Sequence, residues 1–215
     1  MEKIAPGRCR GKGRRESLCP VVNRQVLIAL LPALLLLFST AVVGCGGKPT
    51  EAAEKTREAV GIISSSRELL EDLLLLDQRF NSLGQRYPSI EDTLAEGRSL
   101  AEMAMVDVEE LESRYTRSRD LLREAADAEG AGKYRDYALL ALDAVEPVLE
   151  AVRLNRELLD AVHDMLDVIP MAESAEQLSY YVEEIGRLTE EVSELLRRGA
   201  EAAEEADAYS REHGL

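Results

Sequence analysis

The stretch LSYYVEEIGRLTEEVSEL, residues 178–195, decides the fold class of this chain. Its apolar or small side chains are separated alternately by three and four residues, and the same spacing continues to residue 209. Such a period gives an α-helix one apolar face, and a repeat of about 3.5 residues is typical of helices that pack as in a left-handed coiled coil. This segment therefore predicts one long helix with one buried face. Its stripe consists of Leu178, Tyr181, Ile185, Leu188, Val192, Leu195, Gly199, Ala202, Ala206 and Tyr209.

Three earlier segments carry the same period. They are bounded by residues that begin or end helices: Thr50 and Ser89 are expected N-caps, and Pro170 closes the third segment. At 1.5 Å per residue, helices of this size would each reach about 45–55 Å. The three segments cover residues 51–82, 89–125 and 134–169.

Short connections between long helices favour antiparallel neighbours. The sequence therefore predicts an all-α fold, an elongated antiparallel four-helix bundle with coiled-coil-like heptad packing over residues 51–213; an extended pair of helical hairpins is the alternative. Pro147 removes one backbone donor inside the third segment, but the period continues through it, so we expect one bent helix. Asn155 lies on the apolar seam of that helix, where it could fix the register of packing or lie at the edge and bond to water.

The first 44 residues differ from the rest in charge and hydropathy. They hold seven basic and two acidic side chains, whereas the remaining residues hold 19 basic and 39 acidic ones, a net charge of −20. A body this acidic repels nucleic acids and anionic lipid headgroups, which excludes a nucleic-acid partner. Within the first 44 residues, a basic stretch that ends at Arg24 precedes an apolar run over residues 26–38 and then small residues. This order is typical of a secretory signal peptide.

The motif Val42-Val43-Gly44-Cys45, which ends this segment, resembles the lipobox of bacterial lipoproteins. The resemblance implies that the Cys45 thiol receives a diacylglyceryl group, that residues 1–44 are then cleaved off, and that the new amino terminus is acylated, with palmitate as the expected chain. Two or more acyl chains anchor a protein stably to a membrane, whereas one chain does so only marginally. Residues 45–50 would then be a short lipidated tether, with the body on the extracytoplasmic side of the cell membrane.

Two alternatives concern the same segment. Residues 26–43 form an apolar stretch at the lower length limit for a transmembrane helix, so one alternative is an uncleaved membrane anchor. Arg14 and Arg15 suggest a twin-arginine signal, although the residues after them fit that pattern poorly. In each case the basic flank keeps the start of the chain in the cytoplasm and directs the body outward.

Residue types that carry most enzyme chemistry are scarce. Cys9 and Cys19 would leave with the signal peptide and Cys45 would carry lipid, so no thiol would remain. Neither His163 nor His213 is preceded by Glu at the Glu-x-x-His spacing of helical di-metal sites, and the chain lacks a Gly-x-Ser-x-Gly nucleophile turn. We therefore predict a protein that is not an enzyme and holds no metal and no cofactor.

Two groups of apolar residues form the candidate partner surface. A run of four leucines surrounds too much of the first helix to make one stripe, so Leu75 or Leu76 could face a partner. Tyr87, Tyr180 and Tyr181 are expected to gather at the end of the bundle farthest from the lipid.

These features predict a lipid-anchored, exported helical scaffold or protein-interaction module of the bacterial cell envelope. Its expected partners are membrane lipid, through acylated Cys45, and an envelope protein. The alternative is an extracytoplasmic sensory or solute-binding helical bundle with a pocket between helices near Pro147.

Overall fold

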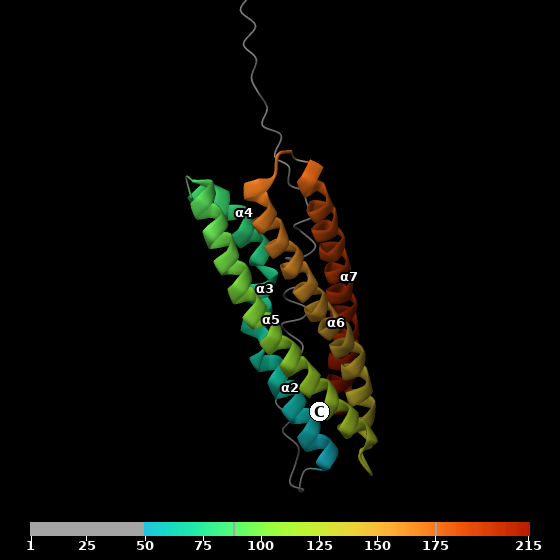
Figure 1. The fold of residues 1–215 in the computed structure, drawn as a ribbon. Coiled ribbons are helices and arrows are strands. Elements are labelled where there is room, and N and C mark those ends of the chain that lie inside the picture. Colours follow the sequence, from blue (N-terminus) through green and yellow to red (C-terminus); the bar gives the residue numbers. More distant parts are fainter. Residues whose placement is uncertain (1–49, 88, 175) are drawn as a thin grey trace, which may run out of the picture.

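The computed structural model describes residues 50–87, 89–174 and 176–215, and helices make up almost all of them (Figure 1). No strand occurs in these ranges, so the all-α prediction is confirmed. In chain order the elements are α2 (Glu51–Ser65), α3 (Arg67–Leu74), α4 (Leu76–Arg86), α5 (Ile90–Asp127), α6 (Lys133–Val168), the short 3-10 helix η1 (Ile169–Met171) and α7 (Glu176–His213).

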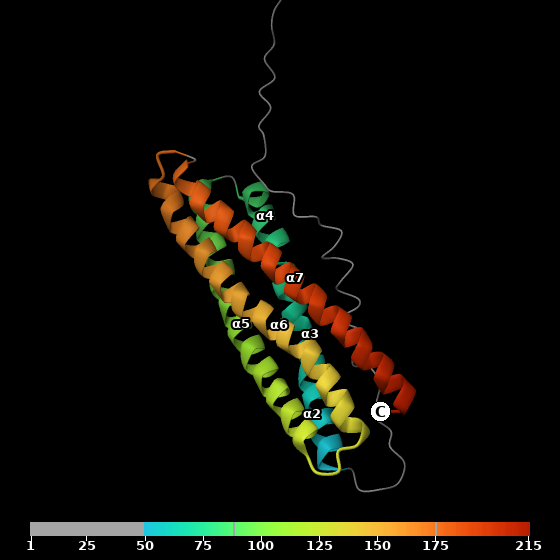
Figure 2. The same cartoon turned by 90° about the vertical axis from the view of Figure 1, so that its right-hand side faces the viewer.

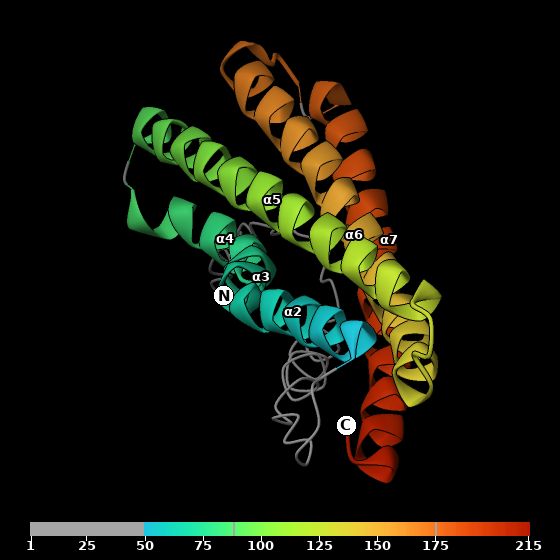
Figure 3. The same ribbon diagram turned by 90° about the horizontal axis from the view of Figure 1, so that it is seen from below.

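The helices pack mainly on their neighbours in the sequence. The broken first segment, α2 to α4, lies along α5, α5 lies along α6, and α6 lies along α7. Figures 1 and 2 show the chain reversing direction at the end of each long segment. Seen from below, α2–α4 and α7 lie on opposite sides of α5 and α6 (Figure 3). We call the end where α4 and α6 finish and α5 and α7 begin the distal end, and the opposite end, where α2 begins at Thr50, the proximal end.

Local signals in the sequence account for the helix ends. The hydroxyl of Thr50 accepts a hydrogen bond from the Ala53 N–H (3.3 Å), and the hydroxyl of Ser89 accepts one from the Asp92 N–H (3.0 Å), so both expected N-caps are confirmed. At the end of α7, Gly214 adopts a φ of +61° and the Leu215 N–H donates to the Ser210 carbonyl (3.0 Å). This bonding pattern is the one by which glycine commonly closes a helix.

The first segment is not the single helix that its period predicted. It is divided into three helices and continues to Arg86 rather than ending near Ser82. The first break falls at Ser66, which is completely buried and donates its hydroxyl to the Ile62 carbonyl (2.8 Å). A serine that bonds to the carbonyl four residues earlier weakens and bends a helix, which explains this break.

The second break, at Leu75, follows from a change in the spacing of buried residues. Leu70, Leu73 and Leu76 are buried at two successive steps of three residues, without the step of four that should alternate. Repeated steps of three overwind a helix, because 3.6 residues make one turn. The run of leucines therefore interrupts the helix where the stripe would otherwise drift away from α5.

The third segment is one continuous helix through Pro147, as predicted. Asn155 is half-buried and its amide donates to the Ala151 carbonyl of the same helix (2.9 Å), so it makes no bond to a neighbouring helix within the described residues. The main core is aliphatic, as expected for a chain with few aromatics, and a smaller cluster at the distal end joins Leu94, Val162 and Leu166. The largest fully buried side chains of the main core include Val108, Leu111, Leu122, Leu149, Val152 and Leu159.

Candidate interaction surface

An aromatic pair marks the distal end, close to the start of α7. The rings of Tyr180 and Tyr181 meet edge to face, with centroids 5.4 Å apart and planes at 76°. Tyr180 is 68% exposed, whereas Tyr181 is half-buried. Large aromatic side chains of this kind anchor many protein interfaces, because they bury much apolar area and lose little conformational freedom.

Tyr87 ends α4 at the same end of the molecule. Its N–H donates to the Leu83 carbonyl (3.1 Å), and its half-buried side chain packs against the main core. In the part of the chain that the structure describes, the ring contact joins Tyr180 and Tyr181 and does not include Tyr87. All three tyrosines thus belong to the distal ends of their helices, but Tyr87 packs against the main core, whereas Tyr180 is exposed and Tyr181 half-buried.

The two leucines proposed as partner residues have different environments. Leu76 is 6% exposed and belongs to the main core, which rules it out as a surface residue. Leu75 is 39% exposed and remains a candidate. The break at Leu75 explains the difference, because the change in spacing turns Leu76 inward and its neighbour outward.

Several exposed apolar residues were missed by the sequence analysis. Beyond Leu75 and Tyr180, they are Ile90, Met103, Val106, Leu139, Met171 and Val182. Met171 and Val182 lie close to Tyr180 along the chain, in η1 and in the first turns of α7. Neither interrupts the heptad-like period, so no signal in the stripe could have identified them.

The apolar face of α7 becomes less buried toward the distal end. From Leu188 onward, this face is buried against the rest of the protein. Nearer the distal end, Ile185 packs at the edge of the smaller cluster, whereas Leu178 and Tyr181 are half-buried and belong to neither core cluster. Val182 is 44% exposed. The apolar face of α7 is therefore only partly buried near the distal end.

Carboxylates surround this part of the surface. Residues 157–191 hold ten acidic side chains and one arginine, a net charge of −9. Arg187 bonds to Glu184 and Glu191, each at 2.8 Å, and the hydrogen bond from Arg187 lowers the pKa of Glu184. Seven other carboxylates in this stretch form no ion pair within the described residues: Glu157, Asp160, Asp164, Glu173, Glu176, Glu183 and Glu190.

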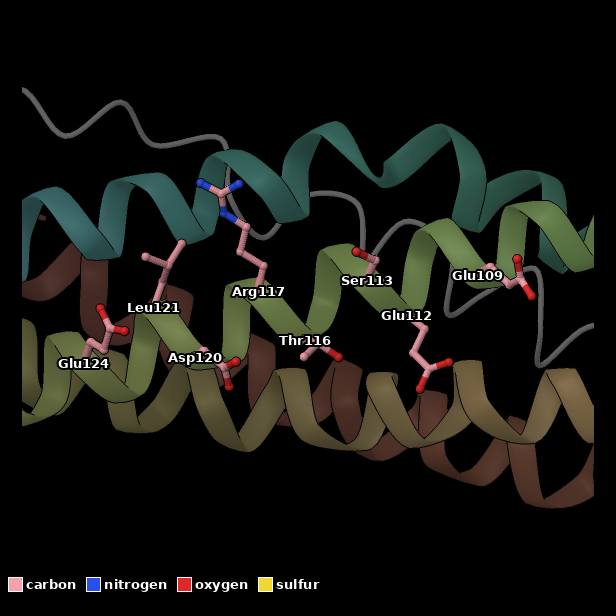
Figure 4. Close-up of a pocket in the computed structure, with 8 residues that line it drawn as sticks. All are labelled: Glu109, Glu112, Ser113, Thr116, Arg117, Asp120, Leu121 and Glu124. Atoms are coloured by element: carbon pink, nitrogen blue, oxygen red, sulfur yellow. The ribbon is translucent and has the colours of Figure 1, made fainter.

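An open hollow of about 620 Å³ follows the outward face of α5 (Figure 4). Its lining residues are spaced three and four apart, so they share one face of the same helix. Five of them are charged. The lining consists of Glu109, Glu112, Ser113, Thr116, Arg117, Asp120, Leu121 and Glu124.

Charged side chains of this hollow form ion pairs with the neighbouring helices. Arg117 reaches Glu58 on α2 (Nη2–Oε1 2.5 Å), and Glu112 bonds to both Arg153 and Arg156 on α6, each at 3.1 Å. In Figure 4 Arg117 extends toward the ribbon of α2 and Glu112 toward that of α6. These pairs link α5 to the helices on either side. Pro147, near which a ligand pocket was predicted, does not line this hollow.

The acidic residues do not assemble a metal centre in the ranges that the structure covers. No group of three or more His, Cys, Asp or Glu side chains is placed there to hold a metal ion. His163 lies 3.7 Å from Asp167 (Nε2–Oδ2), but Arg98 already bonds to Asp167 at 2.9 Å. Asp167 thus already pairs with an arginine.

Among the described helices, none is long and apolar enough to cross a membrane. No protein-family model matches the chain, and no curated protein or solved structure is significantly similar to it. Cys45 and the other residues of the lipobox, Val42, Val43 and Gly44, lie outside the described residues. Any functional interpretation therefore depends on the sequence motif and on the surfaces described above.

Proposed function

We propose that this chain is an exported, lipid-anchored helical scaffold or protein-interaction module of the bacterial cell envelope, without enzymatic activity and without a cofactor. Its resemblance to lipoproteins at Val42-Val43-Gly44-Cys45 supports export and acylation of Cys45. The acidic composition of the remaining chain supports a protein partner rather than a nucleic acid.

For the body we propose an elongated antiparallel four-helix bundle with heptad packing over residues 51–213. The alternation of buried positions supports this architecture: in α5 they fall at Ala101, Ala104, Val108 and Leu111, with steps of three and four. Four long helices that pack against one another form a stable support for a surface at one end, because their positions are fixed by the same core.

The anchor and the aromatic pair would lie at opposite ends. A lipid on Cys45 would hold the proximal end, where Thr50 begins α2, close to the membrane. The 36 residues of α6 extend about 54 Å at 1.5 Å per residue, so Tyr180 at the distal end would lie far from the headgroups. An anchored module of this form would present its distal end to other envelope proteins.

The observation that carries the proposal is the exposure of Tyr180 (68%) and Met171 (73%) near the distal end, outside both core clusters. Aromatic residues and methionine are enriched at protein interfaces. The sensory alternative has less support, because the hollow on α5 is open to solvent and Pro147 does not line it.

The test is crosslinking and co-purification of the full chain from cells, with Cys45→Ala as the matched variant. Labelling with an alkyne fatty acid reports acylation in the same samples. We expect a labelled wild-type chain that copurifies with one discrete protein, and a Cys45→Ala chain that is unlabelled and loses membrane attachment. An unlabelled wild-type chain would overturn the lipid anchor, and an acylated chain with no crosslinked protein would overturn the interaction module.

A further inference from the structure

We infer that α3 and α4 form a strap over α5 that opens by local unfolding while α5, α6 and α7 stay folded. The strap consists of residues 67–86. Its opening exposes the buried leucines of α3 and α4 and the apolar side chains of α5 that they cover. This property of the fold depends neither on a lipid at Cys45 nor on a partner protein.

The strap is built from short helices. The break at Leu75 divides it into α3 with 8 residues and α4 with 11, whereas α5, α6 and α7 have 36 to 38 residues each. Isolated helices shorter than about 12–15 residues are only marginally stable in water. The two helices of the strap therefore depend on their packing against the rest of the protein.

That packing is largely one-sided. Apart from their neighbours in the chain, α3 and α4 lie mainly on α5, whereas α6 lies between α5 and α7 (Figure 3). At the distal end of the strap, Phe80 packs against the smaller core cluster, and a Cβ atom added to Gly97 of α5 would lie 3.6 Å from Cδ1 of Leu83. Among the described residues of the strap, four leucines are buried: Leu70, Leu73, Leu76 and Leu83.

Charges do not hold the strap on α5. Within the described residues, its ion pairs are internal: Arg67 pairs with Glu71, and Arg79 with Asp72. Burial, and after it the charge of Asp72, raises the pKa of Asp107 on α5, so two like charges face each other across this contact. By contrast, α2 is joined to α5 by ion pairs such as Lys55–Glu124 at 2.7 Å.

The segment before the strap separates it from α2. This segment, residues 61–66, reads GIISSS and consists of weak helix formers. A Cβ atom added to Gly61 would meet nothing within 4 Å, so close packing does not require glycine there. The hydroxyls of Ser65 and Ser66 both donate to the Ile62 carbonyl, at 2.9 and 2.8 Å, and such bonds compete with the helical ones. Unfolding of the strap can therefore stop at Ser66.

The other boundary is the start of α5. Ser89 accepts the hydrogen bond from the Asp92 N–H with its own side chain, so this helix is capped without help from the strap. Because the strap is joined to folded helices at both ends, it cannot swing out as a rigid arm. Its opening is the loss of helical structure in one segment, as proteins commonly show for their least stable units.

Arg114 of α5 holds the point where the strap begins. The last carbonyls of a helix lack partners within the helix, and α2 has no basic side chain in its last turn. Nη1 of Arg114 donates to the Ser65 carbonyl at 2.8 Å, and the same side chain pairs with Glu110. This charge-assisted bond fixes the end of α2 on α5, so its loss should promote opening of the strap.

The test is hydrogen exchange of the full chain in detergent, followed by mass spectrometry. We expect the amides of residues 67–86 to exchange about tenfold or more faster than those of residues 137–152, which lie in the buried part of α6. Equal protection of the two segments would mean that the protein opens only as a whole, and would overturn the strap.

Two arginine variants test the boundary at Ser66. Arg114→Ala should speed exchange within the strap about threefold or more, through loss of the charge-assisted bond, and leave residues 137–152 unchanged. The matched control is Arg123→Ala, which removes the same side chain from α5 but breaks a 2.7 Å ion pair with Glu146 of α6. The control should leave exchange in the strap unchanged. Circular dichroism of both variants verifies that the helices remain folded.

The outcomes of this comparison are distinct. Faster exchange throughout the chain in Arg114→Ala would assign Arg114 to global stability and overturn independent opening of the strap. Equal acceleration of the strap in both variants would overturn the role of the bond to Ser65. Neither result bears on the proposed function, because the exchange is measured on the purified chain without a partner protein.

Discussion

A Cβ atom added to Gly199 of α7 would lie 2.8 Å from Cγ2 of Val148 in α6. It would also lie 3.1 Å from the carbonyl oxygen of Ala144, in the turn that contains Pro147. α7 thus approaches the backbone of α6 at this point, and only a residue without a side chain fits. Neither neighbour can move easily, because a β-branched valine in a helix has one strongly preferred rotamer and the carbonyl belongs to the backbone.

Gly199→Ala should therefore destabilise the protein, by about 1–3 kcal/mol, as overpacking of a close helix contact does. The matched control is Gly186→Ala in the same helix, since a Cβ atom there meets nothing within 4 Å. Alanine is the better helix former, so the control should gain up to about 1 kcal/mol. Urea unfolding followed by circular dichroism gives both values. A gain in stability for both variants would show that α7 does not approach α6 this closely.

The pair Leu75 and Leu76 tests the break in the first segment. Leu76→Ala should cost about 2–5 kcal/mol, because it opens a cavity in the main core. Leu75→Ala should cost about 1 kcal/mol or less, since that side chain is 39% exposed. The two variants differ by one position and remove the same atoms, so thermal unfolding compares them directly. Similar losses for both would mean that the helix continues without the change in spacing.

The long segments were predictable because their periods are unambiguous. The second, third and fourth segments agree with α5, α6 and α7; Ser89 caps α5 as predicted, and α6 ends two residues before Pro170. The breaks at Ser66 and Leu75 were not predicted, because the first depends on a hydrogen bond from the Ser66 hydroxyl to the Ile62 carbonyl and the second on which of several adjacent leucines is buried. Packing against α5 determines which leucine is buried, and the spacing of apolar residues in the sequence does not reveal this.

The candidate surface was predicted only in part for a related reason. A stripe indicates which residues of α7 are apolar, but not how fully the neighbouring helices bury each of them. The face that carries Tyr181 and Ile185 continues the pattern of Leu188, and only the arrangement of the other helices shows where the cover ends. Met171 and Val182 lie off the stripe, so their exposure is a property of the fold.

Two buried hydroxyl groups on the contact between α2 and its neighbours should respond in opposite ways to substitution. The hydroxyl of Thr56 is buried and has no hydrogen-bond partner in the structure. Replacement by valine, which has nearly the same shape, should stabilise the protein by about 1 kcal/mol, because an unsatisfied buried polar group is removed. The measurement is the free energy of unfolding in urea.

Ser118 provides the contrasting case. Its hydroxyl is completely buried and donates to the Ala59 carbonyl across the contact between α5 and α2, at 3.2 Å. Ser118→Ala should cost about 1 kcal/mol through loss of this bond. If Thr56→Val destabilised as much as Ser118→Ala, the Thr56 hydroxyl would have to be hydrogen-bonded in solution.

The stability of the protein should also depend on pH through Asp107. Partial burial raises the pKa of its carboxyl group, and the nearby charges of Asp72 and Glu110 raise it further, with Arg79 acting in the opposite direction. Because the pKa is higher in the folded than in the unfolded chain, ionisation of Asp107 opposes folding. This loss of stability is absent below the unfolded pKa of about 4 and complete above the folded pKa.

Asp107→Asn should therefore raise the stability at pH 7 by a few tenths of a kcal/mol, and the gain should vanish near pH 3, where the wild-type carboxyl is protonated in both states. Thermal unfolding at both pH values measures the difference. Asp160→Asn removes one negative charge from an exposed position without an ion pair, and so controls for the general effect of charge. A gain of equal size in the two variants at pH 7 would assign the effect to the net charge of the protein and not to the site between α3, α4 and α5.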